Sequence, residues 1–199
     1  KFVIMSTAVG RIIKDKLVTT SGARPGDFII MTKSAGLEGT AIIANDREAE
    51  LKEKLGTALV NKAKEFINLV SVVKEGVLAG EFGVTSMHDV TEGGILGAIW
   101  EVSEASAVGV EIDRGKIPVE TQTYEICRLY DIDPLKLISS GSMLITCADG
   151  EGLVNHLQNN DVKASIIGRV TSGTQKIIKS GEAFEEIKAP GSDELYKAV

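Results

Sequence analysis

Residues 86–98 read SMHDVTEGGILGA and predict a short strand that ends in a glycine turn and leads into a helix. Apolar residues at helical spacing follow the two glycines. The first N–H groups of such a helix have no partners within it, and the helix dipole is positive at that end. A strand, a glycine turn and a helix in this order therefore form a common site for an anion.

The same stretch carries side chains with chemistry of their own. Gly93 and Gly94 lack a Cβ atom, so a phosphate or carboxylate can approach their backbone closely. Thr91 can donate its hydroxyl to that anion. Asp89 can hold Mg²⁺ or position a nucleophile, and His88 can act as an acid or base because histidine exchanges protons near neutral pH. Asp89 and His88 are therefore candidate catalytic residues, and the other three are candidate phosphate ligands.

These residues also fit an ordinary helix start. Asp89-x-x-Glu92 has the spacing of a capping box, in which the two side chains satisfy free backbone N–H groups. His88 would then be a hydrogen-bonded strand residue without a further role. Caps are far more common than ligand sites, so the spacing alone favours the cap.

Two other loops have the composition of anion-binding turns. Residues 32–40, TKSAGLEGT, follow an apolar strand, and residues 138–143, ISSGSM, precede another. Their candidate ligands are Lys33, Gly36, Ser140 and Gly141, with Ser139 as an alternative to Ser140. Taken singly, each loop reads as a connecting turn. The chain holds no complete Walker A, G-x-G-x-x-G or G-x-S-x-G motif.

Strands and helices interleave along the chain without the strict βαβ regularity of a parallel fold, so we expect helices layered on a mixed sheet. Asn45-x-x-Glu48 has capping-box spacing, and apolar residues at helical spacing follow it to about residue 69, which predicts one long helix. A strand is expected over residues 2–9. A short helix is expected to start at Asp133-Pro134.

The composition excludes several classes of protein. The chain of 199 residues has 28 acidic and 22 basic residues, and aromatic residues make up only 5%, which argues against nucleic-acid binding. No apolar run approaches the roughly 18 residues of a membrane span, and no signal-peptide pattern is present. Cys127 and Cys147 lack the spacing of a zinc site and are expected to be reduced, buried thiols. A cytoplasmic protein that binds neither nucleic acid nor membrane is the prediction.

Together the three loops resemble one protein family. Residues 87–98, MHDVTEGGILGA, are similar to the glycine-rich motif of the aminoimidazole ribonucleotide (AIR) synthetase superfamily, the PurM-like proteins. Residues 23–44, ARPGDFIIMTKSAGLEGTAIIA, resemble its P-G-D strand with the turn and short helix that follow. The superfamily includes purine enzymes, selenophosphate synthetase, thiamine-phosphate kinase and the hydrogenase maturation protein HypE. The stretches that most resemble HypE and AIR synthase-related proteins are residues 101–119, 126–144 and 164–170, and the whole resemblance covers about residues 9–170.

The resemblance implies a fold and a division into domains. Members have an N-terminal domain that carries most of the ATP and Mg²⁺ site and forms the dimer, and a C-terminal domain that supplies the glycine-rich loop. This chain is similar to the C-terminal domain alone, an α+β three-layer sandwich with a mixed sheet. Residues 1–10 would be a lead-in strand or linker from the missing domain, residues 11–184 the domain itself, and residues 185–199 a surface tail.

The resemblance also implies an activity that uses ATP and Mg²⁺, with Asp89 as a Mg²⁺ ligand shared with the missing domain. HypE dehydrates a carbamoyl group to a nitrile during hydrogenase maturation. Two departures argue against that chemistry: the sequence ends without the terminal cysteine that carries the group in HypE, and Glu92 stands where HypE has arginine. The implied partners are the protein's own N-terminal domain, a small-molecule substrate and a maturation partner protein, with a homodimer in the longer protein. The 199-residue chain alone is expected to be inactive and to hold no cofactor tightly.

Two other functions stay open. The fold can persist in a non-catalytic module that binds a metabolite or a protein. The chain can also belong to a phosphotransferase similar to selenophosphate synthetase or thiamine-phosphate kinase, since Thr32-Lys33 follows the P-G-D strand as it does in selenophosphate synthetase. The sequence does not name the substrate.

Overall fold

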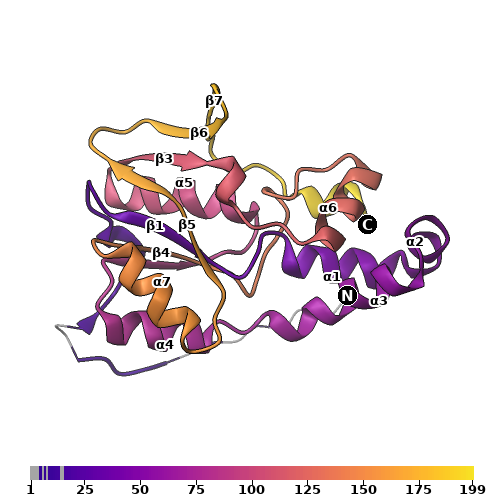
Figure 1. Cartoon of the computed structure of the whole chain (residues 1–199), viewed down its shortest axis with the longest axis horizontal. Helices are drawn as coiled ribbons and strands as arrows, with labels where there is room; N and C mark the ends of the chain where they lie inside the picture. Colours follow the sequence, from indigo (N-terminus) through magenta and orange to yellow (C-terminus); the bar gives the residue numbers. More distant parts are fainter. Residues whose placement is uncertain (1–4, 6, 8, 14–15) are drawn as a thin grey trace.

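A mixed sheet forms the centre of the computed structural model, which describes residues 5, 7, 9–13 and 16–199 (Figure 1). In this part of the chain seven strands have the order β2-β4-β1-β5-β3-β6-β7. Neighbours are antiparallel except β3 and β6, which are parallel, so the mixed sheet is confirmed. The strands are β1 (Phe28–Thr32), β2 (Ser86–Asp89), β3 (Gly109–Asp113), β4 (Met143–Cys147), β5 (Ala164–Thr171), β6 (Lys176–Ser180) and β7 (Ala183–Glu186).

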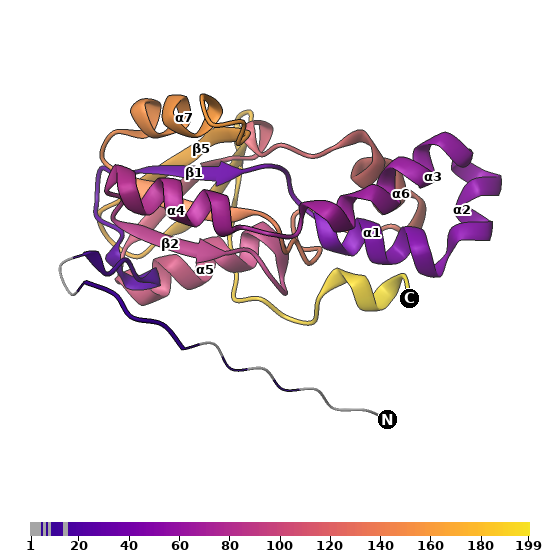
Figure 2. The ribbon, with the colours of Figure 1, turned by 90° about the horizontal axis from the view of Figure 1, so that it is seen from below.

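Helices cover both faces of this sheet and complete the predicted three-layer sandwich (Figure 2). Helices α4 (Val73–Phe82) and α7 (Gly150–Gln158) lie on one face and contact each other. Helix α5 (Gly94–Ser106) lies on the other face. In the described part of the chain, no helix is both long and apolar enough to cross a membrane.

Successive side chains of β1 face opposite layers, as the pleat of a strand requires. Ile29 and Met31 join the core under α5. Ile30 joins the core under α4 and α7, together with Ala79 and Leu153. The strand is therefore buried on both faces, which explains why its sequence is continuously apolar and does not alternate.

A helical lobe extends beyond one end of the sheet (Figure 2). It contains α1 (Leu37–Asp46), α2 (Glu48–Leu55), α3 (Thr57–Lys64) and α6 (Thr121–Tyr130). Its core holds the buried residues Ile43, Leu51, Val60, Ile126 and Ala198. The short 3-10 helices named among the described residues are η2 (Thr20–Gly22), η3 (Glu65–Leu69), η4 (Arg114–Lys116) and η5 (Glu194–Lys197). Through η5 and Ala198 the end of the chain packs against this lobe.

The single long helix predicted over residues 48–69 is wrong. Helix α2 ends at Leu55 and α3 begins at Thr57. Gly56 between them has φ +87°, which lies outside the helical region and turns the chain. The apolar spacing continues through this break, so periodicity alone could not reveal that α3 folds back to contact α1 and α2.

The capping box predicted at Asn45 and Glu48 is also wrong. Asn45 lies inside α1, where its Nδ2 donates to the Ala41 carbonyl at 2.7 Å. Glu48 instead forms ion pairs with Lys52 at 2.6 Å and Lys64 at 2.8 Å. Glu48 therefore stabilises the packing of α2 on α3 and leaves the helix start without a side-chain cap.

Three further segments have different outcomes. No element is predicted for residues 73–82, which form helix α4 around the fully buried Ala79, although they include two glycines of low helix propensity. The helix predicted at Asp133-Pro134 is only a turn, in which the Leu135 N–H donates to Asp133 Oδ1 at 3.0 Å. The strand predicted over residues 2–9 lies largely outside the described residues, and residues 5, 7 and 9 belong to no helix or strand.

Both cysteines are buried and free, as the sequence predicts. Burial raises the pKa of the Cys127 thiol to about 12 and that of the Cys147 thiol to about 11. The thiolate is the reactive form of cysteine, so both side chains are poor nucleophiles at neutral pH.

The segment of residues 185–199 runs across the molecule from β7 to the helical lobe (Figure 2). Ile187 joins the core under α5, and Ala198 joins the core of the lobe. Asp193 between them is only 4% exposed. This segment is therefore fastened at three points to the surface on which it lies.

Candidate functional site

The three loops singled out in the sequence meet at one edge of the sheet. Strands β1 and β2 end there and β4, which pairs with both, begins there. The Val90 N–H donates to the Ser142 carbonyl at 3.0 Å, and the Gly36 N–H donates to Ser139 Oγ at 2.9 Å. Residues 32–40, 88–94 and 138–143 therefore form one connected surface, although each lies far from the others in sequence.

Buried hydroxyl groups join two of these loops. Ser142 Oγ donates to the Ser34 carbonyl at 2.7 Å, and Thr32 Oγ1 accepts the Met143 N–H at 2.9 Å. Ser139 lies fully buried beside Ser142. Ser139 is therefore part of the framework, whereas Ser140 stays partly exposed.

The ammonium group of Lys33 is held by the protein itself. Lys33 Nζ donates to three backbone carbonyls at 2.7–2.9 Å, those of Leu69, Ser71 and Gly141. It also lies 2.8 Å from Glu75 Oε1, on a side chain that is 4% exposed. Lys33 therefore ties the end of β1 to the start of α4, and an anion would have to displace these partners to reach it.

The capping box predicted at Asp89 and Glu92 is wrong. Asp89 is the last residue of β2, and α5 begins only at Gly94, with Gly93 as its N-cap. Both glycines have positive φ, +79° and +62°. The chain therefore turns after Glu92, and Asp89, Thr91 and Glu92 are left exposed on the surface of the turn.

A carboxylate from the C-terminal segment occupies the start of α5. Asp193 Oδ2 accepts the Gly93 N–H at 2.7 Å. Asp193 Oδ1 accepts the Ile138 N–H at 3.2 Å and the Leu195 N–H at 2.8 Å. The N–H group at the start of α5 therefore donates to a carboxylate of the chain itself, at the end of the helix where the dipole is positive.

Glycines of two of these loops pack closely against other atoms of the protein. A Cβ atom on Gly94 would lie 2.6 Å from the Leu135 carbonyl oxygen, and one on Gly93 would lie 2.8 Å from Cβ of Pro190. A Cβ atom on Gly141 would collide with the Leu69 carbonyl oxygen. Close packing against the protein's own atoms accounts for these glycines, so their presence does not require a ligand.

His88 is held between two side chains that the sequence does not single out. Its Nδ1 lies 3.1 Å from Thr20 Oγ1, and its Nε2 lies 2.8 Å from Glu101 Oε2. Thr20 comes from η2 and Glu101 from α5, two elements that contact each other and β2. Contacts across 68 and 13 residues leave no spacing signal in a single sequence.

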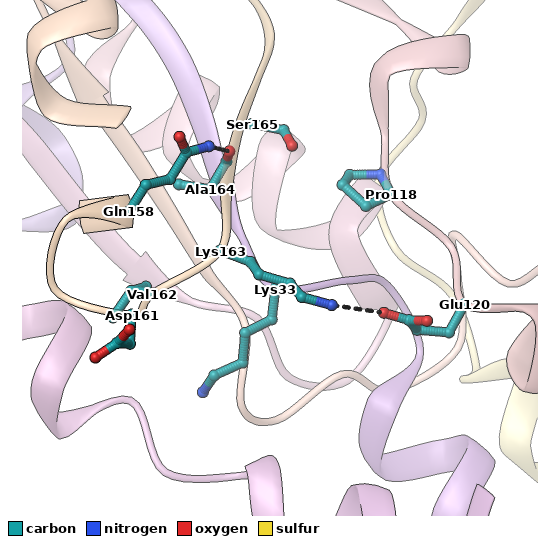
Figure 3. Close-up of a pocket in the computed structure, with 9 residues that line it drawn as sticks. All are labelled: Lys33, Pro118, Glu120, Gln158, Asp161, Val162, Lys163, Ala164 and Ser165. Carbon is teal, nitrogen blue, oxygen red and sulfur yellow. Dashed lines mark hydrogen bonds and ion pairs between the residues drawn. The ribbon is translucent and has the colours of Figure 1, made fainter. Parts of the chain in front are cut away.

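Three hollows lie near or beside these loops. One of about 400 Å³ is lined by Thr20, His88 and Asp89 together with apolar residues of α4. Another of about 500 Å³ lies between α5 and the C-terminal segment, with Gly93 and Lys136 in its wall. A third of about 520 Å³ surrounds the start of β5 (Figure 3). There Lys163 Nζ lies 3.7 Å from Glu120 Oε1, an exposed pair at the wall of the hollow.

Magnesium, which the resemblance implies, can be tested against the donors present. Among the described residues, no group of three or more His, Cys, Asp and Glu side chains is placed to hold a metal. Mg²⁺ commonly binds through one or two carboxylates together with substrate phosphates. Asp89 is an exposed carboxylate at the mouth of the loop, so it fits as one ligand of a Mg²⁺ ion that arrives with phosphates.

Curated proteins similar to this chain are enzymes and maturation factors. The chain is 27% identical over 187 residues to carbamoyl dehydratase HypE of Cupriavidus necator, covering 93% of this chain and 50% of that protein. It is 29% identical over 198 residues to thiamine-monophosphate kinase of Pyrococcus horikoshii, covering 98% of this chain and 58% of the kinase. The chain therefore spans about half the length of these relatives.

Solved structures share the fold. A crystal structure of the hydrogenase maturation protein HypE in complex with ATP matches with a TM-score of 0.70 and 18% identity, over 96% of this chain and 58% of that one. A HypE–HypF complex matches with a TM-score of 0.65 and 23% identity, over 87% of this chain and 56% of that one. The sequence model described as AIR synthase related protein, C-terminal domain, matches residues 24–180. The chain belongs to this family.

Proposed function

We propose that the chain is the C-terminal domain of an ATP-dependent, HypE-like enzyme and supplies an anion-binding loop at the interface with an N-terminal domain. The observation that carries the proposal is the Asp193 carboxylate at the start of α5. The Gly93 and Ile138 N–H groups that receive it come from two different loops. Backbone donors arranged around one carboxylate suit one face of a phosphate equally well.

An external anion would take these donors by replacing Asp193. The two anions cannot share the Gly93 N–H, so binding of the ligand and docking of the C-terminal segment would compete. Tyr196 Oη lies 3.4 Å from Glu92 Oε1, a second contact between the segment and the loop. Release of the segment would therefore free the Gly93 and Ile138 N–H groups beside the polar turn, which is already exposed.

The exposed residues of the turn would complete the site. The Thr91 hydroxyl would donate to a phosphate oxygen, and the Asp89 carboxylate would hold Mg²⁺ or orient the nucleophile. Bound Mg²⁺ supplies neutralisation of phosphate charge. His88 has both ring nitrogens engaged, so we assign it no direct contact with the phosphate.

The relatives support the proposal that the N-terminal half of the longer protein uses ATP and that the protein acts in maturation. The HypE structure contains ATP, and another contains HypE with HypF. By analogy we propose that the N-terminal half brings most of the ATP site, that the whole protein dimerises, and that a maturation partner binds it. The isolated 199-residue chain would then lack turnover.

A phosphotransferase is the second candidate. Thiamine-monophosphate kinase is as similar to this chain as HypE is, and it aligns over nearly the whole chain. By the resemblance described for residues 87–98, the exposed Glu92 would stand where HypE has arginine, which favours a reaction other than carbamoyl dehydration. A third candidate is a non-catalytic module that has the same fold and binds a metabolite or a protein but catalyses no reaction.

Calorimetric titration of Mg-ATP into the full two-domain protein tests the proposal. We expect binding by the full protein, at least about tenfold weaker binding by Asp89→Ala, and no binding by the 199-residue chain. Glu182→Ala, on an exposed turn between β6 and β7, is the matched control and should bind as the wild type does. If the full protein does not bind Mg-ATP, or if Asp89→Ala binds it unchanged, the proposed site is wrong.

Turnover separates the candidates. Release of phosphate in the presence of a carbamoyl donor supports the HypE-like reaction, and transfer to a phosphate-ester acceptor supports the phosphotransferase. Mg-ATP binding without turnover of either substrate supports the non-catalytic module.

A further inference from the structure

Thr20, His88 of β2 and Glu101 are joined in a row by two hydrogen bonds. Thr20 Oγ1 lies 3.1 Å from His88 Nδ1, and Glu101 Oε2 lies 2.8 Å from His88 Nε2. We infer that Thr20 is a nucleophile, activated by His88 and Glu101, that accepts an acyl group from an ester or thioester. This inference uses neither the start of α5 nor the C-terminal segment, and it shares with the proposed ATP site only Asp89, which lies at the rim of the same hollow.

The partners of the ring fix the direction of its hydrogen bonds. An ionised carboxylate only accepts, so Glu101 selects the tautomer that carries the proton on Nε2. His88 Nδ1 then has a free lone pair and accepts the hydroxyl proton of Thr20. A hydroxyl that donates to a histidine whose other nitrogen is held by a carboxylate is the arrangement that activates a nucleophile.

The backbone around Thr20 is rigidly placed. The Thr20 carbonyl accepts hydrogen bonds from Ser86 Oγ at 3.0 Å and from Ser106 Oγ at 3.2 Å. Thr19 forms an isolated parallel bridge with Ser86, the first residue of β2. These contacts attach η2 to β2 and α5, so the hydroxyl of Thr20 is oriented by elements of the fold. Positioning of this kind is a large part of the rate gain in a nucleophilic reaction.

The hollow beside these residues determines the class of substrate. Thr20 and His88 line a space of about 400 Å³ whose other walls are mainly apolar, from Val72, Val73, Val77, Met87 and Met143. Val73 and Val77 are 72% and 54% exposed, which leaves apolar surface for an acyl chain. Asp89 at the rim disfavours an anionic substrate. A neutral or cationic ester with an apolar acyl group fits this hollow.

The proposed step balances with water as the only co-reactant. Thr20 Oγ attacks the acyl carbon while its proton moves to His88 Nδ1. The bond from the acyl carbon to the alcohol or thiol breaks, and the leaving group takes the proton from Nδ1. Water then attacks the threonine ester with His88 as the base, releases the carboxylic acid and restores the Thr20 hydroxyl.

Acylation of the 199-residue chain by p-nitrophenyl butyrate tests the inference. Intact mass spectrometry follows the butyryl adduct, and peptide mapping locates it. We expect the adduct on Thr20 in the wild type and on residue 20 in Thr20→Ser. His88→Gln should form it about 100-fold more slowly, since general base catalysis contributes at least that much. Glu101→Gln keeps the shape of its side chain and should also slow it.

Two control variants distinguish acylation of Thr20 from non-specific acylation of exposed side chains. Thr19→Val removes the neighbouring exposed hydroxyl and should leave the adduct unchanged. Thr20→Val should remove the adduct while keeping the carbonyl contacts that hold η2. An equal adduct in Thr20→Val, or the absence of any adduct on residue 20 in both the wild type and Thr20→Ser, overturns the inference.

Discussion

Asp193 Oδ2 accepts the backbone N–H of Gly93 at 2.7 Å, so residues 100 positions apart meet at the start of α5. The glycine-rich loop is therefore already an anion site in this structure, with a carboxylate of the same chain as its anion. The C-terminal segment and the glycine-rich loop are joined through this carboxylate, and an external anion that used the Gly93 N–H would have to displace Asp193.

Asp193→Asn should open the loop to external anions. The amide has a similar shape but no negative charge, so its bond to the Gly93 N–H is weaker. We expect inorganic phosphate to bind the variant at least about tenfold more tightly than the wild type. Titration followed by NMR should show the amide signals of Gly93 and Ile138 shifting together.

Glu182→Gln removes one negative charge at an exposed turn and is the charge-matched control. A similar gain in that variant would mean that net charge, not release of the loop, causes the effect. Phosphate shifts confined to other amides would contradict the assignment of the site.

Continuous apolar runs allowed the sequence to predict β1 and β4, because burial on both faces leaves a signal in consecutive residues, and apolar residues at helical spacing allowed it to predict α5. The same reasoning failed at Gly56, where one backbone angle breaks a helix without disturbing its apolar spacing. The capping box at Asp89 failed because a four-residue pattern does not show where the strand ends and the helix begins. Asp193, Thr20 and Glu101 could not be found, since their partners are brought near only by the folded chain.

Loss of the Lys33 ammonium should destabilise the fold strongly. Lys33→Met leaves Glu75 buried and without its ion pair, which costs about 3–5 kcal/mol for a buried charge. The free energy of unfolding, measured by urea denaturation, should fall by that amount. The double variant Lys33→Met, Glu75→Leu should recover part of it, because it removes both charges.

Lys54→Met is the comparison for a lysine in an exposed pair. Its ammonium lies 2.7 Å from Glu50 Oε1 on the surface of α2, where solvent screens the interaction. We expect almost no change in the urea midpoint. Equal losses in Lys33→Met and Lys54→Met would show that Lys33 does not tie β1 to α4.

Gly94→Ala should destabilise the start of α5. The left-handed conformation at φ +62° costs an alanine about 1–2 kcal/mol, and its Cβ would meet the Leu135 carbonyl oxygen. We expect a total loss above about 2 kcal/mol in urea denaturation. Gly173→Ala is the control, because Gly173 has φ +91° but open space around its Cβ position, so only the backbone term applies. Equal losses would mean that close packing at Gly94 contributes nothing.

The ion pairs of Glu48 should make part of the stability depend on pH. Hydrogen bonds from Lys52 and Lys64 lower the pKa of the Glu48 carboxyl from 4.5 to about 2. A carboxyl whose pKa is lower in the folded state than in the unfolded state stabilises the fold when the pH is above its unfolded-state pKa. This stabilisation is lost as the pH falls through its folded-state pKa. Glu48→Gln should therefore have a lower Tm than the wild type at neutral pH, and this difference should shrink between about pH 4.5 and about pH 2. Glu53→Gln on the same helix is the control. A difference between wild type and Glu48→Gln that stays constant across this window would show that the charge of Glu48 does not join α2 to α3.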